Sequence, residues 1–313
     1  MSRRIFVCLE RCFVGLRPLG HTSSRALSVS SAQPPAPPRG TQTPSAPSAH
    51  EVEKHISVLQ QETREHLQCN DFGSALTSAL ACLETCDVHF GRSHAATACA
   101  LNNVGQVHRQ SGELAKALPY LEDAVEVYRG VCGAEHGSTG QALSNLGLLH
   151  AALAQRSKGV ERMEHVEASQ GLLERALECR RKAFGEGHPQ VGIAMYQLAT
   201  AARLQKKFST AETLLQGAVG VLRAAEGPGG LATATALNNL GLLRKEMGQF
   251  PAAMEAYREA LETRTQKLGQ RHPDALTSLH NLAECTRASG DEEGALKMQR
   301  DILAIMERGK GPE

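Results

Sequence analysis

Apolar residues recur along most of the chain at the spacing of amphipathic helices. The pattern is clearest over residues 235–261, where Leu237, Leu240 and Leu243 fall on one helical face. Gly248 favours a helix end there, because glycine readily takes the left-handed conformation of a C-cap. A second apolar face then begins at Phe250. The pattern predicts two helices joined by a tight turn.

This unit recurs along the chain in one register. The second polar residue of a Leu-Asn-Asn-Leu motif and its variants lies at positions 103, 145, 197, 239 and 281, in steps of 42, 52, 42 and 42. A glycine marker keeps the same steps at Gly91, Gly133, Gly185, Gly227 and Gly269. A histidine marker lies at His94, His136, His188 and His272, and Gly230 takes its place in the fourth copy. Three markers in one register indicate a repeat protein.

The order of residues within one unit identifies a type of repeat. Counting from Leu237, the residues are large at 0, small at +4, glycine at +11, alanine at +16, aromatic at +20 and alanine at +23. This order resembles the tetratricopeptide repeat, an antiparallel helix pair with a usual period of about 34 residues. The Leu-Asn-Asn-Leu signature, the 42-residue step and the junction at 268–273 are similar to the kinesin-light-chain type, over roughly residues 52–307.

The resemblance implies an all-α fold, a right-handed tetratricopeptide α-solenoid of about six helix-turn-helix repeats. We expect a presequence at 1–31, a Pro-rich disordered linker at 32–50, the superhelical domain at 51–308 and a disordered tail at 309–313. Gly241 and Ala260 should lie where helices cross closely.

Three departures from the regular pattern carry their own predictions. The first repeat is degenerate, and we expect its polar residues Glu62, Thr63 and His66 to face water in a terminal capping helix. Ten extra residues near 155–164 should lengthen the turn between two helices, where they disturb no stacked face. The junction at 227–230, which lacks the histidine, should be a flexible joint.

The N-terminal segment has the composition of a mitochondrial presequence. Residues 1–50 contain six arginines and a single acid, Glu10, and residues 5–16 could form one apolar helical face. A secretory signal and a disordered tail are the alternatives, but Glu10 and Arg11 interrupt the apolar run. We predict removal of the leader at about residues 27–34. The Pro-rich segment at 32–49 serves as a spacer or as a ligand for proline-binding domains.

Mitochondrial import is therefore the predicted localisation, with the cytoplasm as the alternative. The nine cysteines show no paired Cys-x9-Cys framework, so the matrix is favoured over the intermembrane space.

The sequence offers little chemistry of its own. It has no phosphate-binding glycine loop and no Gly-x-Ser-x-Gly elbow, so we expect neither an enzyme nor a bound cofactor. A net charge of +1, no tryptophan and 4% aromatic residues argue against nucleic-acid binding. The leader is too short and too charged to span a membrane. We expect protein or peptide partners instead.

Histidine and cysteine allow two metal-site hypotheses, both of which we disfavour. The histidine marker recurs once per repeat at a helix start, which is typical of a structural position. Cys82, Cys86 and His89 share one helix face and could supply three zinc ligands. The other interpretation, a small apolar stripe in the core, is favoured because cysteine packs well there.

A groove is the most specific site that the resemblance implies. In such proteins the first helices line the concave side, and the second Asn can pair with the backbone of an extended peptide. The expected peptide-binding groove consists of Asn103, Asn145, Gln197, Asn239 and Asn281 and, one turn on, Gln106, Leu148, Thr200, Leu242 and Glu284. Packing between repeats is the other role open to these amides. None of the ten is the Lys or Arg with which chaperone-tail-binding relatives hold a carboxylate, and this disfavours that role.

Three functions remain open on the sequence. A mitochondrial adaptor or assembly factor and a permanent subunit of a larger complex would use the same fold. A cytosolic cargo adaptor of the kinesin-light-chain sort is the third. Kinesin light chains carry a heptad coiled coil before their repeats, whereas this chain has an arginine-rich leader and prolines, and this favours the first.

Overall fold

The computed structural model describes residues 48–227 and 229–307, and these form six antiparallel helix pairs without a strand. The presequence, nearly all of the linker, Pro228 and the tail lie outside the described residues. The first helices of the pairs are α2 (Ala49–Gln68), α4 (Ala95–Gln110), α6 (Gly137–Arg156), α8 (Pro189–Leu204), α10 (Leu231–Glu246) and α12 (Pro273–Ala288). The second helices are α3 (Phe72–Phe90), α5 (Leu114–Cys132), α7 (Gly159–Phe184), α9 (Phe208–Glu226), α11 (Phe250–Leu268) and α13 (Glu292–Glu307).

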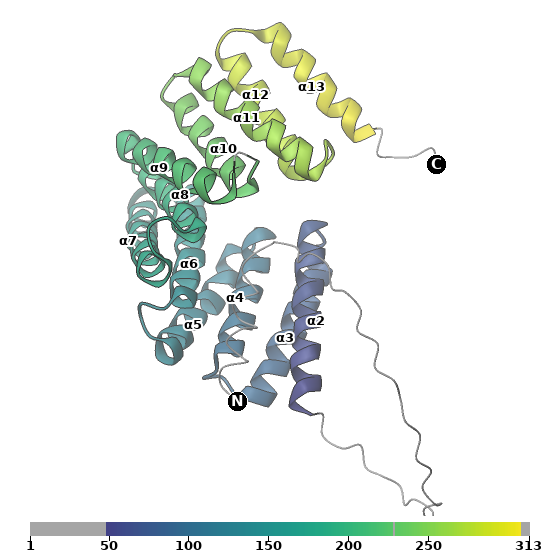
Figure 1. The fold of residues 1–313 in the computed structure, drawn as a ribbon, viewed down its shortest axis with the longest axis vertical. Coiled ribbons are helices and arrows are strands. Elements are labelled where there is room, and N and C mark those ends of the chain that lie inside the picture. Colours follow the sequence, from purple (N-terminus) through teal and green to yellow (C-terminus); the bar gives the residue numbers. More distant parts are fainter. Residues whose placement is uncertain (1–47, 228, 308–313) are drawn as a thin grey trace, which may run out of the picture.

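The pairs stack into a curved solenoid, as Figure 1 shows. Each second helix packs against its own first helix and against the first helix of the next pair. The expectation of an all-α solenoid of about six repeats is confirmed. None of the described helices is both long enough and apolar enough to cross a membrane.

The histidine marker begins a helix in four of the repeats. The Nδ1 atom of His188 accepts a hydrogen bond of 3.1 Å from the backbone N–H of Gln190, and the other three make the same contact. This contact satisfies one of the backbone donors that a helix start leaves free. Gly230 provides no side-chain cap at the fourth junction. The structural interpretation of this histidine is thus confirmed.

The glycine marker closes the preceding helix. Gly185, for example, has φ +83°, a left-handed conformation that residues with a Cβ rarely adopt. The marker turns the chain between α7 and His188, whose ring stacks on Phe184 at a centroid distance of 4.6 Å.

Two predicted departures are wrong in their detail. The ten extra residues do not lengthen the turn: α6 has 20 residues where α4 has 16, and α7 has 26 where α5 has 19. Only Ser157 and Lys158 separate α6 from α7, because the inserted sequence after Gly159 consists mostly of good helix formers. The insertion makes a longer helical hairpin.

The polar residues of the first repeat face inward. Thr63 is 3% exposed and donates to the carbonyl of Leu59, while Glu62 accepts a hydrogen bond of 3.2 Å from Ser78 on α3. Only His66 reaches solvent to a larger extent. Helix α2 can bury these residues because their own backbone and α3 satisfy their polar atoms.

Helices cross most closely at small residues. A Cβ added to Gly241 on α10 would lie 2.8 Å from the ring of Tyr257 on α11, which is too close for any side chain. Gly105 and Gly147 meet leucines of their own second helices in the same way. Ala260 is completely buried. The close crossing expected at Gly241 is confirmed, and Ala260 lies in a buried cluster with Ala234 and Leu237 of α10.

Enlarging Gly241 should therefore destabilise the solenoid. We expect Gly241→Leu to cost about 1–3 kcal/mol through overpacking against Tyr257. Lys245→Ala, one turn along the same helix, should change the free energy of unfolding much less. Thermal denaturation followed by circular dichroism measures both. Equal losses from the two substitutions would show that the packed face of α10 is assigned incorrectly.

Candidate peptide-binding groove

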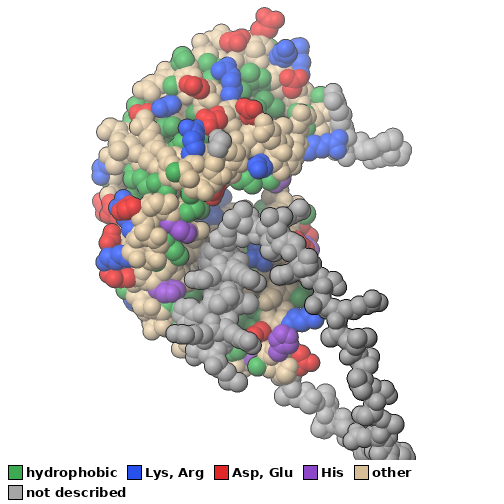
Figure 2. Space-filling view, in the orientation of Figure 1, with side chains coloured by type: hydrophobic (Ala, Val, Ile, Leu, Met, Phe, Trp, Pro, Cys, Tyr) green, Lys and Arg blue, Asp and Glu red, His purple; other side chains and the backbone are tan. Residues whose placement is uncertain are grey.

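The first helices line the inner side of the curve. Successive first helices contact one another from α4 through α6, α8 and α10 to α12, in addition to packing on second helices. The inside of a curved stack is its shorter side, so the helices that approach one another there form the concave surface. Figure 2 shows the curved body in space-filling form, with acidic and basic side chains interspersed on its outer left edge.

Two of the predicted amides connect neighbouring repeats. Asn145 is 3% exposed, and its Nδ2 atom donates to the Oδ1 atom of Asn102 at 2.8 Å. Asn281 donates to Asn238 in the same way at 3.1 Å. In both pairs the second polar residue of one repeat meets the first polar residue of the repeat before it. These two contacts are of the kind that the packing alternative requires.

Gln197 is also engaged, by a buried arginine. Arg180 on α7 is 1% exposed and donates to the side chains of Gln141 and Gln197 and to the carbonyl of Gln190. Burial lowers the pKa of this guanidinium to about 10, so it remains charged at neutral pH. The residue links α6, α7 and α8 beneath the inner surface.

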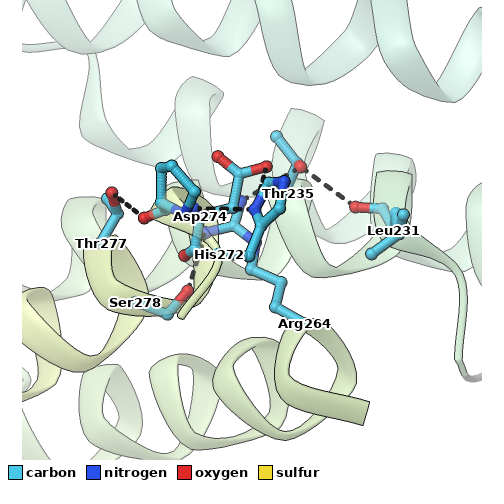
Figure 3. A network of polar contacts seen from close by, with 8 residues as sticks. Leu231, Thr235, Arg264, His272, Asp274, Thr277 and Ser278 are labelled. Atoms are coloured by element: carbon cyan, nitrogen blue, oxygen red, sulfur yellow. Dashed lines mark hydrogen bonds and ion pairs between the residues drawn. The ribbon is translucent and has the colours of Figure 1, made fainter. Parts of the chain in front are cut away.

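Arg264 on α11 makes the equivalent connection two repeats later. Its guanidinium donates to the carbonyl of Asp274 at 3.0 Å, to Ser278 at 2.7 Å and to Thr235 at 3.2 Å. Figure 3 shows this network, in which three helices converge on one side chain. Arg180 and Arg264 both lie five residues before their marker glycine. The sequence analysis assigned no role to this position, which holds Cys86, Tyr128 or Leu222 in other repeats, so both arginines were missed.

Asn103 and Asn239 are the amides that remain available. Both are half-buried, and neither hydrogen-bonds with another described residue. Asn103 and Gln106 line a hollow of about 80 Å³ between α2 and α4, together with Gln60, Thr63, Arg64 and Leu67. This hollow, called the inner hollow below, contains two of the predicted groove residues.

The residues one turn further on are mixed in character. Gln106 accepts a hydrogen bond of 2.9 Å from Arg109, and Glu284 forms an ion pair of 2.8 Å with Arg287. Leu148 and Leu242 are half-buried, and Thr200 donates to the carbonyl of Tyr196. Most side chains of this row therefore pack against neighbours or bind residues of their own helix, and few of their hydrogen-bonding groups are left for a ligand.

A basic row lies six residues beyond the amide row, and the sequence interpretation missed it. It consists of Arg109, Arg203, Lys245 and Arg287. The signal was present in the sequence as a base six residues after each of four predicted polar positions. Glu246 pairs with Arg203, and Glu284 pairs with Arg287. Arg109 has no acidic partner among the described residues, and burial lowers the pKa of its guanidinium.

The inner hollow thus has two arginines beside it. Arg64 is held by Gln61 at 2.7 Å and Arg109 by Gln106, and neither forms an ion pair with a described residue. A guanidinium has five donors in a planar fork that matches a carboxylate. None of the ten predicted groove residues is basic, but Arg64 and Arg109 place positive charge on the surface next to them.

The cysteine stripe belongs to the core. Cys82 and Cys86 are buried in a cluster with Val52 and Ile56, whereas His89 is exposed at the end of α3. The three side chains of the zinc hypothesis therefore do not share one environment, and the packing interpretation is favoured.

A family model decides what kind of repeat this is. The tetratricopeptide repeat model matches residues 68–130, 96–168, 160–224, 203–266 and 232–308, which together cover most of the chain. This chain is a tetratricopeptide repeat protein. The kinesin-light-chain resemblance expected from the 42-residue step agrees with the relatives that this chain is similar to.

Among curated proteins, kinesin light chain-related 3 of Arabidopsis thaliana is 23% identical to this tetratricopeptide repeat protein over 246 residues. The match covers 79% of this chain but only 36% of that relative, so the chain spans about a third of its length.

Solved structures share the fold at lower identity. Kinesin-light-chain-like repeats of Podosopora anserina are 20% identical with a TM-score of 0.53, covering 70% of this chain and 99% of theirs. BtubC (BKLC) of P. vanneervenii is 18% identical with a TM-score of 0.58, covering 85% and 94%. A Rap protein complexed with Competence and Sporulation Factor is 14% identical with a TM-score of 0.58, covering 83% and 78%.

The two kinds of amide should respond differently to truncation. Asn145→Ala leaves the buried Oδ1 atom of Asn102 without its donor, and we expect a loss of about 1–3 kcal/mol in the free energy of unfolding. Asn103→Ala removes an amide without a partner and should change it by less than about 0.5 kcal/mol. Chemical denaturation compares the two variants. A stability loss at Asn103 as large as that at Asn145 would contradict this division.

Proposed function

We propose that this protein is a mitochondrial adaptor or assembly factor that holds an extended, acidic segment of a partner protein in its concave groove. The inner hollow carries the proposal, because Asn103 and Arg64 line it, Arg109 lies next to it, and none of the three has an acidic or amide partner in an ion pair or hydrogen bond across repeats within the described residues. A solenoid of this kind presents an extended concave surface suited to binding another protein.

The chemistry of the ligand follows from the groups that are free. A side-chain amide offers a donor and an acceptor and can pair with a main chain of any sequence. The guanidinium groups add a preference for carboxylates, whether from Asp, Glu or a chain terminus. Asn239, three repeats beyond Asn103, offers a second amide without a hydrogen-bond partner among the described residues. The Rap protein complexed with Competence and Sporulation Factor supports the ability of this fold to hold a ligand.

The mitochondrial part of the proposal rests on the leader. Its five arginines and single acid have the composition of a matrix-targeting presequence. A cytosolic cargo adaptor is the second candidate, and the similarity to kinesin light chain-related 3 favours it. That relative is much longer than this chain, so its function does not transfer directly.

Localisation separates the two candidates. A fluorescent reporter fused to residues 1–50 should accumulate in mitochondria and lose the leader. The same fusion with Arg3, Arg4, Arg11 and Arg17 replaced by Gln should stay in the cytosol, since import needs the positive charges. A wild-type fusion that remains cytosolic and uncleaved would rule out the mitochondrial assignment and leave the cargo adaptor.

Partner capture tests the groove. If Asn103 and Asn239 pair with a peptide backbone, each lost amide should weaken binding by roughly 0.5–1.5 kcal/mol. The double substitution to Ala should then reduce capture about tenfold, since 1.4 kcal/mol is a factor of ten. Arg109→Gln should reduce it further and make it less sensitive to salt. Quantitative mass spectrometry of proteins that co-purify with the tagged chain measures these effects.

The matched control removes amides from the outer surface. Gln216→Ala with Gln270→Ala deletes two exposed amides on α9 and beyond α11, and capture should be unchanged. A groove variant that keeps its melting temperature and still captures the same partners at full strength would refute binding through the free amides.

A further inference from the structure

A second groove lies in the first two repeats, apart from the inner hollow. A groove of about 670 Å³ runs between α3 and α5, with α4 as its floor. Its apolar lining includes Leu83, Leu101, Tyr120 and Val127. We call this site the outer groove. It shares no lining residue with the inner hollow.

The floor of the outer groove is partly open at Leu101. Leu101 is half-buried, as are the equivalent residues Met195 and Leu279, whereas Leu143 of the next repeat has no exposed surface. Val131, at the end of the groove, is 46% exposed. Exposed apolar surface of this kind is typical of a site that another segment covers.

The walls of the outer groove are acidic. Asp123 and Glu126 on α5 are exposed, and neither forms an ion pair with a described residue. Asp87 on α3 accepts a hydrogen bond of 3.2 Å from Arg92 through Oδ2, while its Oδ1 atom is buried and has no donor within the described chain. Arg92 is the single basic residue among the lining residues, and its side chain is 84% exposed. The groove therefore suits a ligand that is apolar on one side and basic beside it.

The chain itself contains a segment of this chemistry. Residues 3–17 carry apolar side chains at Ile5, Phe6, Leu9, Phe13 and Leu16, with Arg3, Arg4, Arg11 and Arg17 beside them. Helix α2 starts at Ala49 and packs by its first half against the end of α3 that borders the outer groove. Residues 18–47 can span up to about 100 Å when extended, so reach is not limiting.

We propose that the arginine-rich segment 3–17 docks into the outer groove of its own chain. Its apolar side chains cover Leu101 and Val127, and its arginines lie beside Asp87, Asp123 and Glu126. The leader of the full chain is then sequestered until another protein displaces it. A receptor for the leader and the outer groove would compete for the same segment.

The absence of tryptophan makes docking measurable. Phe6→Trp in the full recombinant chain introduces a single tryptophan on the apolar side of the leader. In the docked state its emission should be blue-shifted, and its acrylamide quenching constant should be several-fold lower than in denaturant. Adding Asp123→Lys and Glu126→Lys should shift the emission to that of exposed tryptophan and raise the quenching constant by the same factor.

The control reverses two charges elsewhere. Glu122→Lys with Glu255→Lys changes the net charge equally on exposed residues that do not line the groove, and the tryptophan should stay protected. Circular dichroism confirms that each variant folds. Tryptophan that is solvent-exposed in the otherwise unaltered chain, or protected regardless of Asp123 and Glu126, would overturn the proposal. Protection that disappears on dilution would assign the groove to the leader of a second copy and overturn docking within one chain.

Discussion

The whole structure depends on the fact that one helix pair cannot bury its own apolar surface. Each second helix has a face for its own first helix and another for the first helix of the next pair, so the core is continuous only while the pairs keep their register. Close crossings at Gly105, Gly147 and Gly241 set the distance within pairs. The 42-residue step in the sequence is the consequence of this packing, and the histidine caps and glycine corners mark its period.

The same packing explains why the amide row is divided. In two repeats an amide of this row meets the residue 43 positions earlier, which belongs to the preceding repeat. Where that residue is Asn102 or Asn238, the two amides bind each other. For Asn239 the equivalent position holds Tyr196, and the amide remains free. The residue of the preceding repeat thus distinguishes Asn145 and Asn281 from Asn239, whereas Asn103 makes no hydrogen bond with a described residue although its equivalent position holds Gln60.

The fold could be predicted from the sequence because its markers are local and periodic. The helix starts, the corners and the small residues at crossings all follow from residues within one unit. The site was less predictable, since it depends on contacts between units. Arg180 and Arg264 occupy positions that are apolar in other repeats, and only the structure shows their polar partners on three helices. The inserted residues were assigned to a turn because spacing alone does not distinguish a longer loop from longer helices.

The central claim is that Asn145 and Asn281 hold repeats together while Asn103 and Asn239 are available to a ligand. Hydrogen exchange of the side-chain amide groups, followed by NMR on asparagine-labelled protein, tests this directly. The account predicts slow exchange at Asn145 and Asn281 and fast exchange at Asn103 and Asn239, because only the first two donate to a neighbouring repeat. Equal protection of all four amides would contradict it.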